Sequence, residues 1–418
     1  MRTRHVLVTS LLLLGSAVLA PSCGRAQSSD PTFKLIYTFP GAPGAILAKF
    51  WSADNRGVIY GSGLAGGDKE CAYCGTVFLM QPPAGSGGSW SQVTIYVFPG
   101  HGGGSEGGPV VPGPNHVVFG ASLYGGPSGC GELYRFQQAG GAWKENVIHN
   151  FTCTDGSYVN GLVSAGGVLY GTTANGGAFG YGEIFQVNPP ASGGGAYTLT
   201  VLYSFTGGAD GANPTGLILW NGSLYGGTTG GGAGPCNTGQ PSPGCGTIWQ
   251  LAPPASGDAW TESTLYSFAG GADGSSPTSL VADGGGGFYG VACGASCGSA
   301  AGQGAVFQLT PGPWTVSPLY TFGGQPDGGQ GPNSIVPAGS GALVGTTGGG
   351  GSYNHGTAFL LSPPAVSGGA WTETIVHDFG SKSGSNPSGV VMGAKGVVYG
   401  ATAQAGSSNA GTAFRIQP

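Results

Sequence analysis

The chain has 418 residues, of which 90 are glycine, 30 are proline and only 7% are charged, and its formal net charge is −5. Hydrophobic residues make up 39% and aromatic residues 10%, which supplies a buried core and argues against a disordered chain. No Lys or Arg lies between Lys144 and Lys382, so most of the surface lacks the cations that bind nucleic-acid phosphates or anionic membranes.

The N-terminal segment has the pattern of an export signal. Two arginines in residues 2–4 precede an apolar run over 6–20, which is too short to span a bilayer. Cleavage fits best after Ala26, and lipid attachment at Cys23 is the alternative. We therefore predict a signal over 1–26, no transmembrane segment, and a bacterial protein that is secreted or held at the cell surface or in the periplasm.

Seven segments that follow the signal end in the same way, with a Tyr or His two positions before a Phe. In six of them another aromatic residue lies eight positions before the Phe, as in Trp260, Tyr266 and Phe268. Even spacings predict that all three side chains lie on one face of a β-strand. We interpret the Trp as core between blades, with a sugar-stacking platform as the alternative. The closing residues are Phe39, Phe98, Phe151, Phe205, Phe268, Phe322 and Phe379.

Two further strand patterns follow each closing Phe. One is an apolar strand closed by Gly, with an aromatic–Gly pair such as Tyr170-Gly171 in six units and Val344-Gly345 in the other. The second starts as Gly-x-x-aromatic, as from Gly182 to Phe185. A short apolar strand, such as 216–219, precedes each aromatic–Gly pair. Each unit of about 55 residues thus holds four short strands and no helical pattern. Seven such units predict an all-β fold, a seven-bladed β-propeller with four antiparallel strands per blade.

The two ends of the repeat array complement each other. The array begins with a lone outer strand over 33–39 and ends with three strands over about 389–417. Pairing of the first strand with the segment near 411–417 would complete the seventh blade and leave no exposed edge. A solenoid would instead need atypical capping repeats. We therefore predict one propeller domain over 33–418, and we expect a monomer.

Three motifs carry a resemblance to a known family. They are Leu224–Thr229, the Gly-Thr-Ile start at Gly246, and Leu265–Phe268 followed by Gly270–Gly274. They resemble the GloVer-type tandem-repeat family of exported bacterial proteins, and more loosely the kelch-type propeller repeats. The resemblance covers roughly residues 33–418. It implies export and surface display, and it implies no activity and no catalytic residue.

Eight cysteines follow the predicted signal, and all of them lie in loops expected on one face of the propeller. Three pairs lie in the lengthened loops between the second and third strands of blades 1, 4 and 5, and the fourth pair joins two loops of blade 2. Disulfides are the expected state in an exported chain, although Cys71-x-x-Cys74 leaves redox activity or zinc binding open. The pairs are Cys71 with Cys74, Cys130 with Cys153, Cys236 with Cys245, and Cys293 with Cys297.

Four connections between successive blades carry an Asp-Gly step. They predict an arc of carboxylates around one mouth of the channel, and carboxylates with loop carbonyls suit calcium or a cationic ligand. The alternative is turn chemistry, because Asp-Gly is a favoured turn dipeptide. Apart from calcium we expect no cofactor. The four residues are Asp155, Asp210, Asp273 and Asp327.

Two histidines and two glutamates complete the candidates for chemistry. His101 and His355 lie in Gly-rich loops on the cysteine-bearing face, as candidate ligands or bases. Glu132 and Glu183 occupy equivalent positions in adjacent blades, and a carboxylate pair of this kind could serve glycoside hydrolysis.

These observations favour an exported binding or scaffold propeller. We expect its ligand to be a glycan or another extracellular or cell-surface protein, bound on the cysteine-bearing face. The alternative is a hydrolase or lyase acting on a polysaccharide or a lactone, with the Asp arc or a metal at the channel mouth. A third hypothesis is a purely structural envelope protein.

Overall fold

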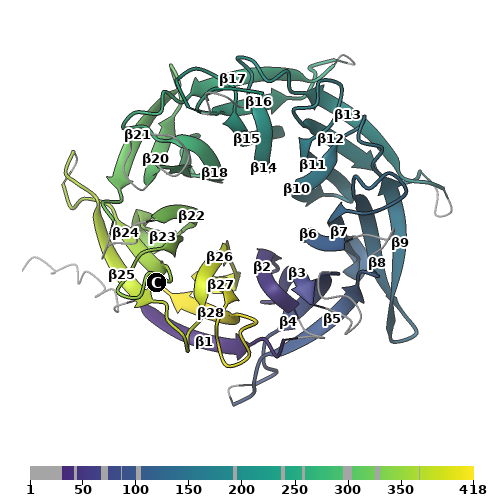
Figure 1. The fold of residues 1–418 in the computed structure, drawn as a ribbon, viewed down its shortest axis with the longest axis horizontal. Coiled ribbons are helices and arrows are strands. Elements are labelled where there is room, and N and C mark those ends of the chain that lie inside the picture. Colours follow the sequence, from purple (N-terminus) through teal and green to yellow (C-terminus); the bar gives the residue numbers. More distant parts are fainter. Residues whose placement is uncertain are drawn as a thin grey trace, which may run out of the picture. The chain divides into compact units, whose positions relative to one another are not determined.

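A computed structural model shows seven antiparallel sheets of four strands each, arranged as a β-propeller (Figure 1). The predicted fold is therefore confirmed. The structure describes residues 31–41, 45–66, 74–85, 87–99, 105–191, 195–236, 241–256, 259–294, 304–324, 330–366 and 368–418. All seven sheets lie in the unit Pro31–Pro418. Within these residues there is no helix with the length and apolarity needed to cross a membrane. The predicted signal over 1–26 lies outside the described residues.

Each sheet is one blade, in which the first strand is innermost and the fourth is outermost. Blade 1 consists of β2 (Ala45–Ala53), β3 (Ile59–Gly66), β4 (Thr76–Gln81) and β5 (Ser91–Val97). Blade 2 consists of β6 (Ser105–Pro112), β7 (Val118–Tyr124), β8 (Glu132–Ala139) and β9 (Ala142–Asn150). Blade 3 consists of β10 (Ser157–Ala165), β11 (Val168–Asn175), β12 (Glu183–Asn188) and β13 (Thr198–Ser204). Blades 4 and 5 consist of β14 (Ala212–Trp220), β15 (Ser223–Gly230), β16 (Thr247–Ala252) and β17 (Thr261–Ser267); and β18 (Ser275–Ala282), β19 (Phe288–Cys293), β20 (Gly304–Thr310) and β21 (Thr315–Thr321). Blades 6 and 7 consist of β22 (Gln330–Pro337), β23 (Leu343–Gly349), β24 (Thr357–Ser362) and β25 (Thr372–Asp378); and β26 (Ser385–Met392), β27 (Val398–Gln404), β28 (Thr412–Gln417) and β1 (Thr32–Thr38). Single 3-10 turns join the first and second strands of blades 2, 6 and 7, at Pro114–His116, Gly339–Gly341 and Ala394–Gly396.

Blade 7 closes the ring in the way the sequence predicts. Strand β1 pairs antiparallel with β28, and Thr32 lies opposite Gln417 (Figure 1). The Phe39 N–H donates to the Gly411 carbonyl at 3.2 Å. The outermost strand of the last blade therefore comes from the start of the described chain.

The repeated glycines follow from close packing inside each blade. Gly171 lies opposite Phe185 on the neighbouring strand, and a Cβ at Gly171 would lie 2.2 Å from the Phe185 ring. Gly182 has φ +91°, a conformation that favours glycine, and its carbonyl accepts the N–H of the closing Phe205 at 3.0 Å. These two contacts explain why the Gly that follows the second-strand aromatic or Val, and the Gly-x-x-aromatic motif, recur in every unit.

The fourth, outermost strand of each blade contains a β-bulge. In blade 3, Tyr203 pairs with Ile184 and Val201 pairs with Phe185, so Leu202 has no partner of its own on the neighbouring strand. The same shift occurs in the other six blades. A bulge inserts one extra residue and reverses the side-chain alternation beyond it.

The bulge overturns the predicted single face of the fourth strand. Trp90, before the bulge, packs on Tyr399 of the preceding blade, with ring centroids 5.4 Å apart. Phe98, after the bulge, packs on Tyr134 of the following blade, also at 5.4 Å. One strand therefore supplies aromatic side chains to both of its neighbours, and Trp90 belongs to the core between blades.

Side chains also join the innermost strands to one another. Thr215 donates to the Pro277 carbonyl at 2.9 Å, and Ser388 donates to the Ala48 carbonyl at 2.8 Å. Each innermost strand packs against the next, and β2 packs against β26 to complete the ring. Because these links run between blades, they position the residues that face the centre.

Candidate functional site

A groove between blades 1 and 2 brings polar and aromatic side chains together. It encloses a cavity of about 640 Å³. The turns between the first and second strands of both blades form one wall, and the ends of the third strands form the other. We call this site the blade 1–2 groove. Its principal residues are Arg56, Gln81, Asn115, His116, Gln138 and Trp143.

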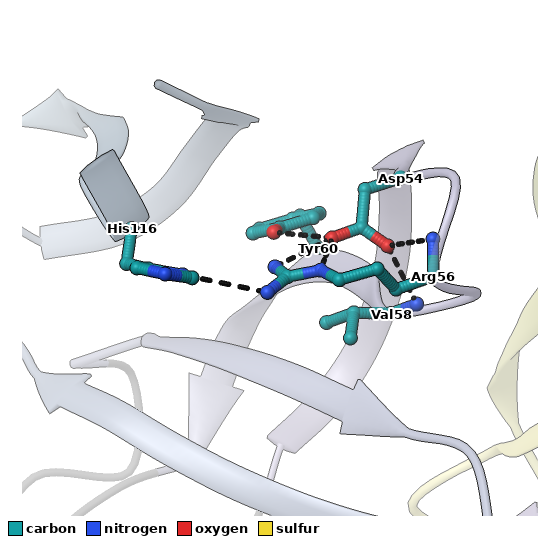
Figure 2. A network of polar contacts seen from close by, with 5 residues as sticks. All are labelled: Asp54, Arg56, Val58, Tyr60 and His116. Carbon is teal, nitrogen blue, oxygen red and sulfur yellow. Dashed lines mark hydrogen bonds and ion pairs between the residues drawn. The ribbon is translucent and has the colours of Figure 1, made fainter. Parts of the chain in front are cut away.

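Arg56 is held at the rim of the groove by a carboxylate from its own turn. Its Nε and Nη2 donate to Asp54 Oδ2 at 2.9 and 2.8 Å (Figure 2). The Tyr60 hydroxyl donates to the same oxygen at 3.1 Å, and the Val58 N–H donates to Asp54 Oδ1 at 3.0 Å. The guanidinium plane is thereby fixed, while the Arg56 side chain stays 55% exposed and open to a ligand.

The charges of the blade 1–2 groove are set by this cluster. Burial disfavours the charged form of Asp54, but hydrogen bonds from Arg56, Val58 and Tyr60 outweigh it and lower the pKa of Asp54. Burial and the neighbouring carboxylate raise the pKa of Tyr60 to about 12. Near neutral pH the cluster is therefore an Asp–Arg ion pair with a neutral phenol.

His116 crosses from blade 2 to reach this pair. Its Nδ1 lies 3.4 Å from Arg56 Nη1 (Figure 2). The backbone at His116 has φ +59°, whereas Gly341 and Gly396 fill the same position in the turns of blades 6 and 7. A non-glycine residue costs about 1–2 kcal/mol in this region. Backbone strain of this kind is found at functional sites, which makes His116 a candidate functional residue.

Three of the four predicted Asp residues are described, and each one stabilises its own loop. Each carboxylate accepts a hydrogen bond from the Tyr or His two positions before the closing Phe, and another from the backbone N–H just after that Phe. The glycines that follow have φ between +83° and +107°, as the turn interpretation requires. No group of three or more metal-ligating side chains occurs in the described ranges. The contacts join Asp155 to His149 and Thr152, Asp210 to Tyr203 and Thr206, and Asp273 to Tyr266 and Ala269.

The cysteine-bearing face is described only in part. Disulfides join Cys130 to Cys153 and Cys236 to Cys245, as predicted. Cys74 and Cys293 are also disulfide-bonded. The half-buried His355 ring lies in the loop before β24, and its Nδ1 has no hydrogen-bond partner among the described residues. The predicted residues that lie outside the described residues are Cys71, His101, Cys297 and Asp327.

The two glutamates are buried inside their own blades. Glu132 accepts a hydrogen bond from Tyr134, and Glu183 accepts one from Ser204 at 2.6 Å. Burial raises the pKa of Glu183. Neither side chain lines the blade 1–2 groove.

Sequence reasoning missed the blade 1–2 groove entirely. Arg56 and His116 are 60 positions apart and lie in turns that vary between units, so no repeat position marks them. Two signals were present in the sequence: Arg56 is one of only 12 Lys and Arg residues, and Asn115-His116 stands where other turns carry glycine.

Solved structures share the fold at low sequence identity. The extracellular domain of a protein named as a candidate hybrid two-component system from B. thetaiotaomicron matches with a TM-score of 0.58 and 12% identity, over 92% of this chain and 39% of that chain. This chain therefore spans well under half of that protein. A candidate 6-phosphogluconolactonase from Bacteroides uniformis matches with a TM-score of 0.47 and 13% identity, over 85% of this chain and 89% of the other.

The sequence itself gives a more specific match. The family described as Gloeobacter/Verrucomicrobia repeat matches residues 25–241 and 236–418. A comparison with curated proteins found no match.

Proposed function

This chain belongs to the Gloeobacter/Verrucomicrobia repeat family, and we propose that it is an exported glycan-binding propeller that holds its ligand in the blade 1–2 groove. The observation that carries the proposal is the fixed Arg56 guanidinium beside the strained His116, in a groove that also contains Trp143. The membership supports the repeat architecture and leaves the ligand open.

The chemistry of the groove suits a sugar. Sugar hydroxyls both donate and accept hydrogen bonds, and Arg56, Asn115 and Gln138 offer complementary amide and guanidinium groups. Trp143 offers an apolar ring face for the carbon–hydrogen side of a sugar ring. A cavity of about 640 Å³ lies within the usual range for small-ligand sites.

Export is supported by the disulfides. Cys130–Cys153 and Cys236–Cys245 would form and persist in an oxidising compartment rather than in a reducing cytosol. We therefore place the protein outside the cytoplasm, secreted or at the cell surface, where glycans are available. From the sequence we expected the ligand on the face that carries the cysteines. The blade 1–2 groove lies among the loops of the opposite face, so the proposed site differs from that expectation.

The proposal is tested by screening the purified protein on a glycan array and then titrating the best soluble oligosaccharide by calorimetry. Arg56→Met and Trp143→Ala should each weaken binding by about tenfold or more. Lys395→Met is the matched control, because it removes a cation from the equivalent turn of blade 7. If no glycan ligand is found, or if Arg56→Met keeps an intact fold and unchanged affinity, the proposal that the groove binds a glycan is refuted.

The same panel tests the alternative of a polysaccharide- or lactone-acting enzyme. Incubation of the wild-type protein with each ligand, followed by product analysis, should leave the sugars intact. Turnover that is lost on Asp210→Ala would establish the enzyme in place of the binding protein.

A further inference from the structure

The centre of the propeller holds a second cavity, of about 340 Å³. The first strands of blades 1, 3, 4 and 5 supply most of its lining, and these strands face the middle of the ring (Figure 1). The lining consists of aliphatic side chains, hydroxyls and amides, with one cation, Lys49 on β2. Among the residues that the structure describes, none of those lining this cavity is acidic.

Lys49 is not required by the repeat. It immediately precedes Phe50, which pairs with Gly61 of the second strand. The residue at the same register position is small or a proline in every other blade. These residues are Pro109, Gly161, Gly216, Ser279, Ser334 and Gly389. The long cationic side chain is therefore an addition specific to blade 1, at a position where the fold is satisfied by glycine.

The Lys49 ammonium has an incomplete set of partners. Nζ lies 4.1 Å from the centroid of the Trp51 ring, and Trp51 is itself fixed by a 2.8 Å hydrogen bond from Nε1 to Ser62. In the part of the chain that the structure describes, Lys49 forms no ion pair. Burial lowers the pKa of Lys49 to about 8, so the group is mostly charged at neutral pH.

A partly buried cation without a counter-ion loses some of its hydration, and an aromatic ring face replaces only part of it. A bound anion would supply the missing partner, and the attraction is stronger at a partly desolvated site than in bulk water. Thr278 and Ser279 place hydroxyl groups in the same lining, and Ile218 and Leu280 supply apolar surface. The cavity thus combines one positive charge with hydroxyl and apolar surfaces.

We propose that the axial cavity is a binding site for a small hydroxylated carboxylate, of the size of a single sugar acid, with Lys49 as the cation that pairs with its carboxylate. The volume is at the lower end of the range for small-molecule sites, which suits one ring rather than a polymer. The site is separate from the blade 1–2 groove and does not depend on it.

The test uses glucuronate as the probe, with glucose as the neutral comparator at matched ionic strength. Calorimetry should show saturable binding of glucuronate and none of glucose. Lys49→Met should weaken the binding by about tenfold or more, and Lys49→Arg should retain most of it. Lys34→Met, which removes an exposed cation from β1, should leave it unchanged. Arg56→Met should also leave it unchanged, which separates this site from the groove.

Three results would overturn the proposal: no saturable binding of glucuronate, equal binding by Lys49→Met, or equal binding of glucose. Equal affinity for inorganic phosphate would overturn the carboxylate class. Thermal unfolding without ligand shows that the variants fold, and Lys49→Met should unfold at the same or a higher temperature because it removes an unpaired, partly buried charge. Glucuronate should raise the unfolding temperature of the wild-type protein but not that of Lys49→Met.

Discussion

The Tyr203 hydroxyl donates a 3.0 Å hydrogen bond to Asp210, and so connects the outermost strand of blade 3 to the loop that enters blade 4. The same carboxylate oxygen accepts the Thr206 N–H at 2.7 Å. Tyr266 and Asp273 repeat the arrangement at the next junction. These carboxylates shape the path from the rim of one blade to the centre of the next.

Replacing Asp210 with Asn should destabilise the protein. The carboxylate accepts bonds from a hydroxyl and a backbone N–H, and hydrogen bonds to charged groups contribute about 1.5–3 kcal/mol. We expect a loss of stability of this order in urea unfolding, and a smaller loss for Tyr203→Phe. Added calcium should change neither result. A calcium-dependent stabilisation of the wild-type protein that vanishes in Asp210→Asn would support the cation site instead.

Replacing His116 with Gly should raise the stability of the protein and weaken its binding to the glycan. Glycine tolerates the φ of +59° at this position, so the variant should be more stable by about 1 kcal/mol. Its affinity for the glycan ligand should fall, because the His116 side chain and its contact with Arg56 are lost. Thermal unfolding and calorimetry on the same preparation check both effects. A variant that is less stable than the wild-type protein would show that the turn is not strained.

Phe39 should be as important for stability as the closing Phe of any other blade. It is fully buried, and its ring lies 5.5 Å from that of Phe78 in blade 1. Phe39→Ala should cost about 3–5 kcal/mol, the usual range for a buried Phe, and Phe205→Ala should cost a similar amount. Val366→Ala is the control, because Val366 is 72% exposed. A cost for Phe39→Ala close to that of the control would mean that β1 contributes little to ring closure.

Glu262 should make stability depend on pH. Burial and the nearby Asp210 raise the pKa of Glu262 to about 7, although a hydrogen bond from Thr264 opposes the shift. The folded state then holds a proton that the unfolded state releases at lower pH, so this residue lowers stability as pH rises from about 4.5 to 7. Glu262→Gln should therefore add about 1–2 kcal/mol at pH 8, after allowance for solvent screening, and almost nothing at pH 4. Unfolding curves of both proteins at the two pH values give the comparison, and an equal gain at pH 4 would contradict the assignment.

The architecture could be predicted because the same pattern of four strands occurs seven times in the sequence. In blade 3 the defining residues are Gly171, Gly182 and the closing Phe205. Their equivalents recur at fixed positions in the other units, so the strand assignment in one unit supported the assignment in the rest. The bulge at Leu202 could not be predicted from spacing alone, because a strand with one extra residue keeps the same aromatic pattern in sequence. It therefore reversed the expected direction of the Trp relative to the Phe.

The candidate sites were the least predictable part, for the opposite reason. Lys49 and His116 stand at positions where other units carry small residues, and the contact between Arg56 and His116 occurs once. Their proximity to other groups depends on how adjacent blades are placed side by side. The repeated Asp residues were visible in the sequence, and their contacts place them in the connections between blades.

Closure through β1 and β28 also orders events during folding. The partner of β1, strand β28, lies almost 400 residues later in the chain, so blade 7 cannot be completed until the whole array has been synthesised. Contacts so distant along the chain form slowly, because a long loop must close before they form. Until the two strands pair, β1 and β28 both present unpaired edges, and a chain halted during synthesis would expose β1 to self-association.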